Sequence, residues 1–214
     1  ENRRTCDLLS SKLYYLYSLL NQRLNKLNNI RNKLYEYYQI SCLQQNLESQ
    51  SVLINLILQN YIEFKLYNLG NKFIEKSEFP TTSSSSQFAR YNYYCGIIST
   101  VKLDYNNALL YMQNGLRRAP QYGAYGFKIK CTKWLIVIQL LMGDIPDKTI
   151  FVSIDGKNNK LQLKPYEMIT ECVREGKLNL FNDTINKYQK IYLNDGLIKI
   201  LLRLKHNVIK TGLR

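Results

Sequence analysis

The sequence has little of what enzymes use for catalysis. His206 is the single histidine among 214 residues, so a Ser-His-Asp or Cys-His arrangement would have to use it. It lies among lysine and asparagine on a predicted amphipathic helix, which is typical of a surface or capping histidine. No G-x-x-x-x-G-K-[ST] loop for ATP is present. Asp144 and Asp147, flanked by Ile145 and Pro146, are interpreted as turn and cap residues. We therefore predict a protein that is not an enzyme.

The cysteines are scattered rather than paired. The five stand tens of residues apart, with no C-x-x-C spacing: Cys6, Cys42, Cys95, Cys131 and Cys172. This spacing predicts no zinc site and is typical of reduced, mostly packed thiols in an intracellular protein. We expect neither a metal nor a cofactor.

Long apolar runs, prolines and glycines are also scarce. The longest apolar run, Trp134 to Met142 with Gln139 inside it, is far short of the ~20 residues that cross a bilayer. No secretory signal opens the chain, and its first residues, ENRRTCDLL, lack an initiator methionine, so we expect an excised or processed fragment. Four prolines and ten glycines are too few for the tight turns of an all-β fold of this size. With 45% apolar residues, the composition favours an all-α protein with a packed core.

Acidic residues are outnumbered by basic ones, 16 to 30, which gives a net charge of +14. Such an excess favours association with nucleic acid, an anionic membrane or acidic proteins. The enrichment in Asn, Lys, Tyr and Ile is equally typical of an AT-rich coding sequence, in which case the charge is compositional. Both interpretations stay open at this stage.

Hydrophobic periodicity predicts helices along most of the chain. Leucines at steps of three, four and seven predict one long amphipathic helix, or two with a small break, at 13–34: Leu13, Leu16, Leu20, Leu24, Leu27 and Leu34. Residues 48–64 are apolar on most sides, as in the middle layer of a bundle. Shorter segments predict helices at 67–76, 87–102, 105–118 and 123–142, with an exposed serine-rich loop from Glu78 to Gln87.

The segment from Gly143 to Pro165 interrupts this pattern. It carries Gly and Pro turn signals and a short β-like stretch around Ile150 to Ile154. Helical periodicity resumes at Pro165, which suits a first helical position, and continues through two or three helices. We predict helical repeats at 1–143, an irregular connector at 144–164 and a helical region at 165–214.

Three small or rigid residues, Gly96, Ala108 and Pro120, recur at twelve-residue steps. If 87–102 and 105–118 form an antiparallel pair, Gly96 and Ala108 lie where the two backbones approach closely, and Pro120 stops the second helix. This pattern resembles the tetratricopeptide repeat, a helix-turn-helix unit of about 34 residues.

A looser copy of the same pattern precedes it. Tyr67 and Gly70 correspond to Tyr105 and Ala108 at an offset of 38 residues (108 minus 70). The few extra residues are expected in the serine loop. Two copies of the pattern predict a solenoid of helical hairpins.

The segment from Pro165 to Gly196 carries a second pattern. Gly176 is expected to end one helix, and Leu178 with Phe181 to begin the next. Together with Tyr166, these residues resemble the helical half of the PCI domain, which occurs in scaffold subunits of the proteasome lid, the COP9 signalosome and the translation initiation factor complex.

Short blocks from about Leu9 to the last residue narrow this resemblance: SEFP, FARYNYYCGII, LRRAPQ, LIVIQLLMGDIPD and LLRLKHNVIKTGLR. They are similar to the subunit 3 branch of the PCI family, the non-ATPase subunits of the proteasome regulatory-particle lid. The resemblance implies a right-handed solenoid of tetratricopeptide-like hairpins leading into the helical part of a PCI domain. It also implies a non-catalytic scaffold role in the cytoplasm and nucleus. Since a winged-helix module follows the closing block in that family, we expect this chain to be a fragment without it.

In a tetratricopeptide-like unit the first helix of each pair lines a concave groove. Arg90 and Tyr93 lie on the helix face expected to point into that groove, and Lys130 and Lys133, three residues apart, are expected to extend a basic strip on the next first helix. The resemblance implies other lid subunits as partners, among them a very small, acidic, largely disordered one. Basic residues with interleaved tyrosines suit that ligand because charge steers it and aromatic rings anchor it.

Direct RNA binding is the competing prediction, since a net charge of +14 with tyrosine-rich helices permits phosphate contacts and base stacking. The sequence has no RNP, KH or dense Lys/Arg motif, and its basic residues are spread along the whole chain. The sequence therefore favours a protein partner over nucleic acid.

Overall fold

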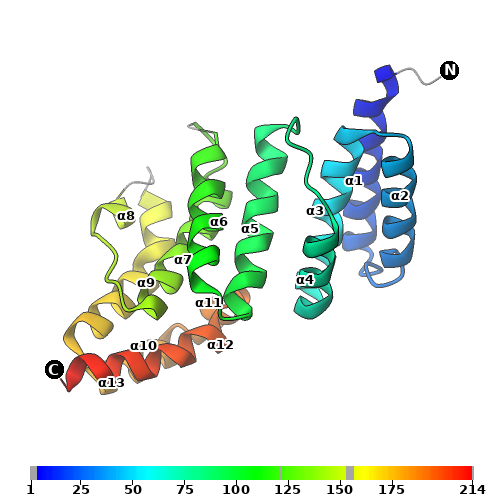
Figure 1. Ribbon diagram of the computed structural model, residues 1–214. Helices are drawn as coiled ribbons and strands as arrows, with labels where there is room; N and C mark the ends of the chain where they lie inside the picture. The colour runs from blue at the N-terminus through cyan, green and yellow to red at the C-terminus, as the bar shows by residue number, and fades with distance from the viewer. Residues whose placement is uncertain (1–3, 121, 153–156, 214) are drawn as a thin grey trace. The chain divides into compact units, whose positions relative to one another are not determined.

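The computed structural model describes residues 4–120, 122–152 and 157–213, and every regular element in these ranges is a helix (Figure 1). In chain order the helices are η1 (Arg4–Cys6), α1 (Asp7–Arg23), α2 (Arg31–Leu43), α3 (Leu47–Glu63), α4 (Tyr67–Lys76), α5 (Ser85–Val101), α6 (Tyr105–Arg118), α7 (Tyr125–Met142), α8 (Thr149–Val152), α9 (Lys157–Glu175), α10 (Leu178–Lys187), α11 (Gln189–Asn194), α12 (Ile198–Leu201), η2 (Leu202–Leu204) and α13 (Lys205–Gly212). The predicted all-α class is confirmed. Contacts group the chain into two compact units, Glu1–Ser99 and Thr100–Arg214.

Helix α3 forms the centre of the first unit. It contacts α1, α2 and α4, and its residues from Val52 to Leu58 are all buried. The helix begins at a cap in which the Asn46 side chain accepts a hydrogen bond from the backbone N–H of Ser49 at 2.9 Å. The prediction that 48–64 is apolar on most sides because it lies in a middle layer is therefore confirmed.

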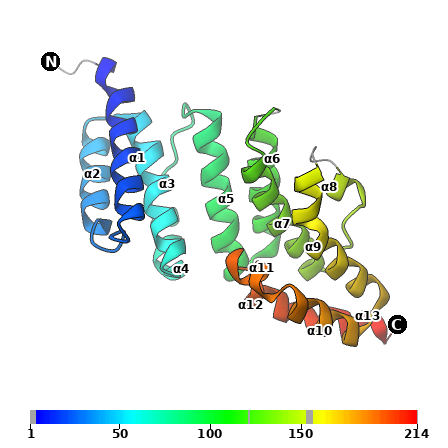
Figure 2. The same ribbon diagram turned by 180° about the vertical axis from the view of Figure 1, so that it is seen from behind.

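The second unit is built around α7 and α9. Residues Cys131 to Ile138 of α7 are buried without interruption, and α7 contacts both α6 and α9. Helices α10 and α13 in turn contact α9, and Figure 2 shows α13 running beside α10. Gly176 ends α9 and Leu178 begins α10, as predicted, with Phe181 only 1% exposed.

The two copies of the tyrosine and small-residue pattern occupy equivalent helix positions. Tyr67 and Tyr105 are the first residues of α4 and α6, so Gly70 and Ala108 are the fourth, and both are buried. A Cβ atom on Gly70 would lie 2.9 Å from Cδ1 of Ile98, which explains why a small residue stands there. The predicted register between the two copies is confirmed.

Short turns of one kind join many of these helices. A residue in the left-handed region, followed by one more residue, precedes the start of α3, α4, α6, α10 and α12: Gln45, Lys65, Leu103, Gly176 and Gly196. After α2 and α3 the N–H of the next residue bonds the carbonyl five residues back, Asn46 to Ser41 at 3.0 Å and Leu66 to Tyr61 at 2.8 Å. These bonds have the six-to-one spacing of Schellman caps. Glycine is the usual residue at the left-handed position of such a cap.

Adjacent glutamines after α2 test the cost of this left-handed conformation. Both are exposed, but Gln45 has φ +53° whereas Gln44 has φ −80°. We expect Gln45→Gly to raise the free energy of unfolding by about 0.5 kcal/mol, because glycine removes the left-handed penalty, and Gln44→Gly to lower it by a similar amount. Urea unfolding of both variants measures the two changes in free energy. Equal changes of the same sign would contradict the left-handed conformation of Gln45.

The leucine stripe of the first predicted helix is divided by the structure. The chain breaks into α1 and α2, with Asn25 at φ +54° between them. Leu27 and Leu34 are buried, but the stripe residues of α1 and its C-cap are 50–63% exposed: Leu13, Leu16, Leu20 and Leu24. Helix α1 instead turns its small residues inward, with Ser11 and Ser18 buried and the Ser10 hydroxyl 2.8 Å from that of Ser49 on α3. Of the two predicted alternatives, two helices with a small break is therefore confirmed, and the α1 part of the stripe does not lie in the core.

The predicted irregular connector at 144–164 is largely helical where it is described. Helix α8 covers Thr149–Val152, so the predicted β-like stretch begins as a helical turn, and its remainder at 153–154 lies outside the described residues. Helix α9 begins at Lys157 and contains Pro165 in its interior rather than at its first position. Periodicity missed these turns because Asn and Lys dominate residues 157–160 and give no apolar stripe.

Candidate functional site

The predicted site residues belong to two different compact units. Arg90 and Tyr93 are on α5 in the first unit, and Lys130 and Lys133 are on α7 in the second.

Arg90 lines a hollow of about 420 Å³ in the first unit. Residues of α1 and α3 form its other walls, among them Lys12, Tyr15 and Glu48. The guanidinium carbon of Arg90 lies 5.7 Å from the centroid of the Tyr15 ring, which is a cation–π distance. Two cations, one carboxylate and an aromatic ring thus share one open hollow.

Tyr93, by contrast, is half-buried on α5 and packs against Tyr94, with ring centroids 5.6 Å apart. Burial raises the pKa of Tyr94 to about 12, so the Tyr94 hydroxyl stays protonated.

On α7 the two predicted lysines differ in their surroundings. Lys130 is exposed, whereas Lys133 is 7% exposed and its Nζ lies 2.7 Å from Oδ2 of Asp195. Residues three apart on a helix differ in direction by about 60°, which on a helix buried from residue 131 onward turns the second lysine into the core. Lys133 therefore does not belong to an exposed basic strip.

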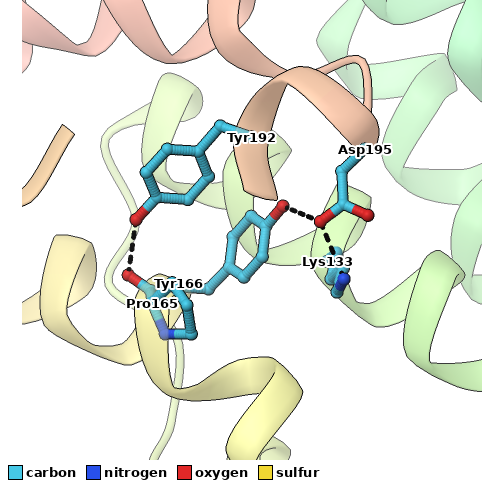
Figure 3. A network of polar contacts seen from close by, with 5 residues as sticks. All are labelled: Lys133, Pro165, Tyr166, Tyr192 and Asp195. Atoms are coloured by element: carbon cyan, nitrogen blue, oxygen red, sulfur yellow. Dashed lines mark hydrogen bonds and ion pairs between the residues drawn. The ribbon is translucent and has the colours of Figure 1, made fainter. Parts of the chain in front are cut away.

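Lys133 instead belongs to a buried polar network (Figure 3), formed by Lys133, Pro165, Tyr166, Tyr192 and Asp195. Oδ2 of Asp195 accepts hydrogen bonds from Nζ of Lys133 and from the Tyr166 hydroxyl, both at 2.7 Å. The Tyr192 hydroxyl donates to the carbonyl oxygen of Pro165 at 2.9 Å. Both tyrosines are fully buried, and their ring centroids lie 5.5 Å apart in an edge-to-face arrangement.

The chemistry of this network is that of a fixed contact. Desolvation by burial raises the pKa of Tyr192 well above its usual value, so its hydroxyl remains a donor. Nζ of Lys133 lies 5.6 Å from the centroid of the Tyr166 ring, which adds a cation–π contact to the ion pair. These groups hold helices together, since one carboxylate oxygen bonds side chains from α7 and α9.

Sequence reasoning found part of this network. It singled out Lys133 and Tyr166, but it interpreted Lys133 as a surface cation and gave Asp195 no role. Asp195 precedes Gly196, and an Asp-Gly pair reads as a turn. A pairing partner 62 residues away leaves no signal in periodicity or spacing.

The residues considered above as catalytic or metal-ligating candidates are either exposed or, in the case of some cysteines, buried as thiols. His206 is exposed on α13, and Asp144 and Asp147 are exposed beyond the end of α7. Burial raises the pKa of Cys95 and of Cys131 to about 12, which keeps both thiols protonated. Within residues 4–120, 122–152 and 157–213, no three His, Cys, Asp or Glu side chains gather as metal ligands would.

Over the described part of the chain, no helix has both the length and the apolar character needed to cross a bilayer.

Comparison with known proteins gives a consistent picture. The family model "PSMD3-like, N-terminal TPR repeats" matches residues 1–170. A relative from Nicotiana tabacum, "Probable 26S proteasome non-ATPase regulatory subunit 3", is 39% identical over 213 residues, which are 100% of this chain and 43% of the relative. The Drosophila melanogaster protein of the same name is 36% identical over 214 residues, again 100% of this chain and 43% of the relative.

A relative from Dictyostelium discoideum, "26S proteasome non-ATPase regulatory subunit 3", is 39% identical over 212 residues, covering 99% of this chain and 42% of the relative. The chain thus spans less than half the length of these relatives. Since the family model covers most of the chain and agrees with its helical hairpins, the chain belongs to the PSMD3-like family of proteins with N-terminal tetratricopeptide repeats.

Proposed function

We propose that this chain acts as a non-catalytic scaffold arm of the proteasome regulatory-particle lid and supports ubiquitin-dependent protein degradation by binding other subunits. The observation that supports this most strongly is the similarity of the whole chain to relatives named as 26S proteasome non-ATPase regulatory subunit 3. Helical hairpins suit such a role because each hairpin packs on the next one along the chain and presents its exposed side chains from a fixed backbone. We expect the protein in the cytoplasm and nucleus.

We further propose the hollow at Arg90 as one partner surface. Arg90 and Lys12 place two cations around Tyr15, an arrangement that can seat an acidic side chain while the ring packs against its stem. Glu48 on the same wall limits the net charge to one positive unit. A small, acidic, extended lid subunit is the partner that this chemistry fits.

Tyr93 and Lys130 are proposed as further contacts, each on its own unit. Tyr93 is half-buried on α5, and Lys130 is exposed on α7. Lys133 is left out, because its ammonium is engaged by Asp195. In the same proposal, residues 165–214 form the helical part of a PCI domain.

Charge reversal tests the hollow. We expect Arg90→Glu to weaken binding of the small acidic lid subunit about tenfold at near-physiological salt, because it replaces a seated cation by a like charge. Lys205→Glu on α13 makes the same change of net charge at an exposed lysine outside the hollow and is expected to change the affinity less than about twofold. Fluorescence anisotropy of the labelled subunit measures both, and equal losses would show that binding follows net charge alone.

The same titration with a single-stranded RNA separates the scaffold role from nucleic-acid binding. Non-specific RNA affinity falls steeply and log-linearly with salt. Salt-resistant binding of the acidic subunit with loss of RNA supports the scaffold. If RNA binding persisted at near-physiological salt while binding of the acidic subunit was lost, the +14 charge would be assigned to nucleic-acid binding instead.

A further inference from the structure

The C-terminal helices are held on α7 by polar contacts that come from a short stretch of chain. Asp195 lies in the turn between α11 and α12, and Asn207 lies on α13. Asp195 accepts from Lys133 at 2.7 Å, and Nδ2 of Asn207 donates to the carbonyl oxygens of Leu140 at 2.8 Å and Leu141 at 3.1 Å. The side chains of Asp195 and Asn207 thus bond α7 in its middle and at its C-terminal end.

The turn that carries Asp195 is itself tightly bonded. The N–H of Asp195 donates to the carbonyl of Ile191 at 2.9 Å, and the N–H of Leu197 donates to the carbonyl of Tyr192 at 3.0 Å. Gly196 between them adopts φ +73°. The carboxylate is therefore presented from a fixed backbone, so its position on α7 fixes the position of α11 and α12 as well.

One carboxylate oxygen joins three segments of the second unit. Oδ2 of Asp195 bonds Lys133 on α7 and Tyr166 on α9, which are 62 and 29 residues away along the chain. Apolar contacts tolerate sliding of one helix past another, but two hydrogen bonds to a single atom are satisfied in one register only. The exposed pair Lys177 and Glu175 has a similar length, 2.8 Å, but joins neighbouring residues in water and fixes no register.

We propose that Lys133, Tyr166 and Asp195 form a latch that sets the register of residues 189–213 on α7, so that breaking it releases these helices as one unit while α6 stays folded. Asn207 at the end of α7 then becomes the remaining polar contact described between α13 and α7. The latch is a conformational device of the second unit and does not depend on the proposed proteasome role.

Hydrogen exchange of the 214-residue chain, followed by mass spectrometry, tests the latch. In Lys133→Met we expect the amides of 189–213 to exchange about a hundredfold faster, and those of α6 to be accelerated at least tenfold less. Tyr166→Phe keeps the ring and the ion pair but removes one donor, and we expect a smaller acceleration of about threefold in the same amides.

Two exposed lysines serve as controls. Lys130→Met removes a cation from the same helix, and Lys177→Met breaks an ion pair of similar length in water. Neither is expected to change exchange in 189–213. Equal acceleration in α6 and 189–213 would show that the network adds only to overall stability and would overturn the latch, as would unchanged exchange in both. If Lys133→Met does not fold, Tyr166→Phe decides by the same comparison.

Discussion

Gly176→Ala is expected to lower the free energy of unfolding by about 3 kcal/mol, because two penalties coincide at this position. Gly176 has φ +66°, which costs a residue with a Cβ about 1 kcal/mol. The added Cβ would also lie 2.5 Å from the Cα and the backbone N of Gly212 on α13. Since those are backbone atoms, relief requires α13 to shift rather than a side chain to rotate.

The close approach is reciprocal, which gives a second variant. A Cβ on Gly212 would lie 2.6 Å from the carbonyl oxygen of Gly176. An Ala in place of Gly within a helix normally stabilises a protein by about 1 kcal/mol. In Gly212→Ala we expect a loss of stability instead, because of the contact with Gly176. Urea unfolding followed by circular dichroism measures both variants.

Gly196→Ala is the matched control. Gly196 has a similar φ, +73°, but among the described residues no atom beyond its chain neighbours lies within 4 Å of its added Cβ. We expect it to lose about 1 kcal/mol, the cost of the left-handed conformation alone. Losses of equal size in Gly176→Ala and Gly196→Ala would mean that the contact between the α9–α10 turn and α13 contributes nothing.

Lys133→Met is expected to lower the free energy of unfolding by about 3 kcal/mol, at the lower end of the range for breaking a buried ion pair. Removing the ammonium leaves the Asp195 carboxylate, whose side chain is 19% exposed, with the Tyr166 hydroxyl as its described donor. The residual exposure and this donor are the reasons for choosing the lower end. Chemical denaturation at neutral pH measures the loss.

A double-mutant cycle separates the ion pair from the volume of the side chains. In Lys133→Met/Asp195→Leu no buried charge is left unpaired, so we expect most of the stability to return, with a coupling energy of about 2 kcal/mol. Lys130→Met on the exposed side of α7 should change stability by less than about 0.5 kcal/mol. Additive losses in the cycle would refute a direct pairing of Lys133 with Asp195.

Local pattern predicted the helices well because apolar spacing and burial coincide in them. Residues 67–76 and 105–118 were predicted with the same bounds that α4 and α6 have. The register of Gly70 with Ala108 also followed from the sequence, since a small residue where bulky ones are the norm marks a close approach of helices. Leu178 and Phe181 were placed at the start of a helix for the same kind of reason.

Turns without glycine were not predictable. Gln45, Lys65 and Leu103 adopt the left-handed conformation that sequence reasoning assigns to glycine or asparagine. At these positions the packing of the flanking helices outweighs a local penalty of about 1 kcal/mol. The structure alone could identify them as the same turn that Gly176 and Gly196 form.

The candidate site was predicted only in part. Arg90 was expected to face the concave groove of the repeats, and in the structure it lines a hollow formed with α1 and α3. Lys133 was assigned to the surface, because spacing gives the angle between two side chains but not which side of the helix is covered. The side of α7 that carries Lys133 is covered by Asp195 and Tyr166, which are distant from it in the chain.

By itself, the sequence determined the all-α class, the order and approximate bounds of most helices, and the small residues where helices meet. It could do so because these features depend on periodicity and on side-chain size, which are local. Only the tertiary structure decided that the leucines of α1 point outward, that Lys133 is buried in an ion pair and that Gly176 touches Gly212. Each of these depends on which distant segment packs against a given face, and that choice is made by the whole core rather than by any single stretch of chain.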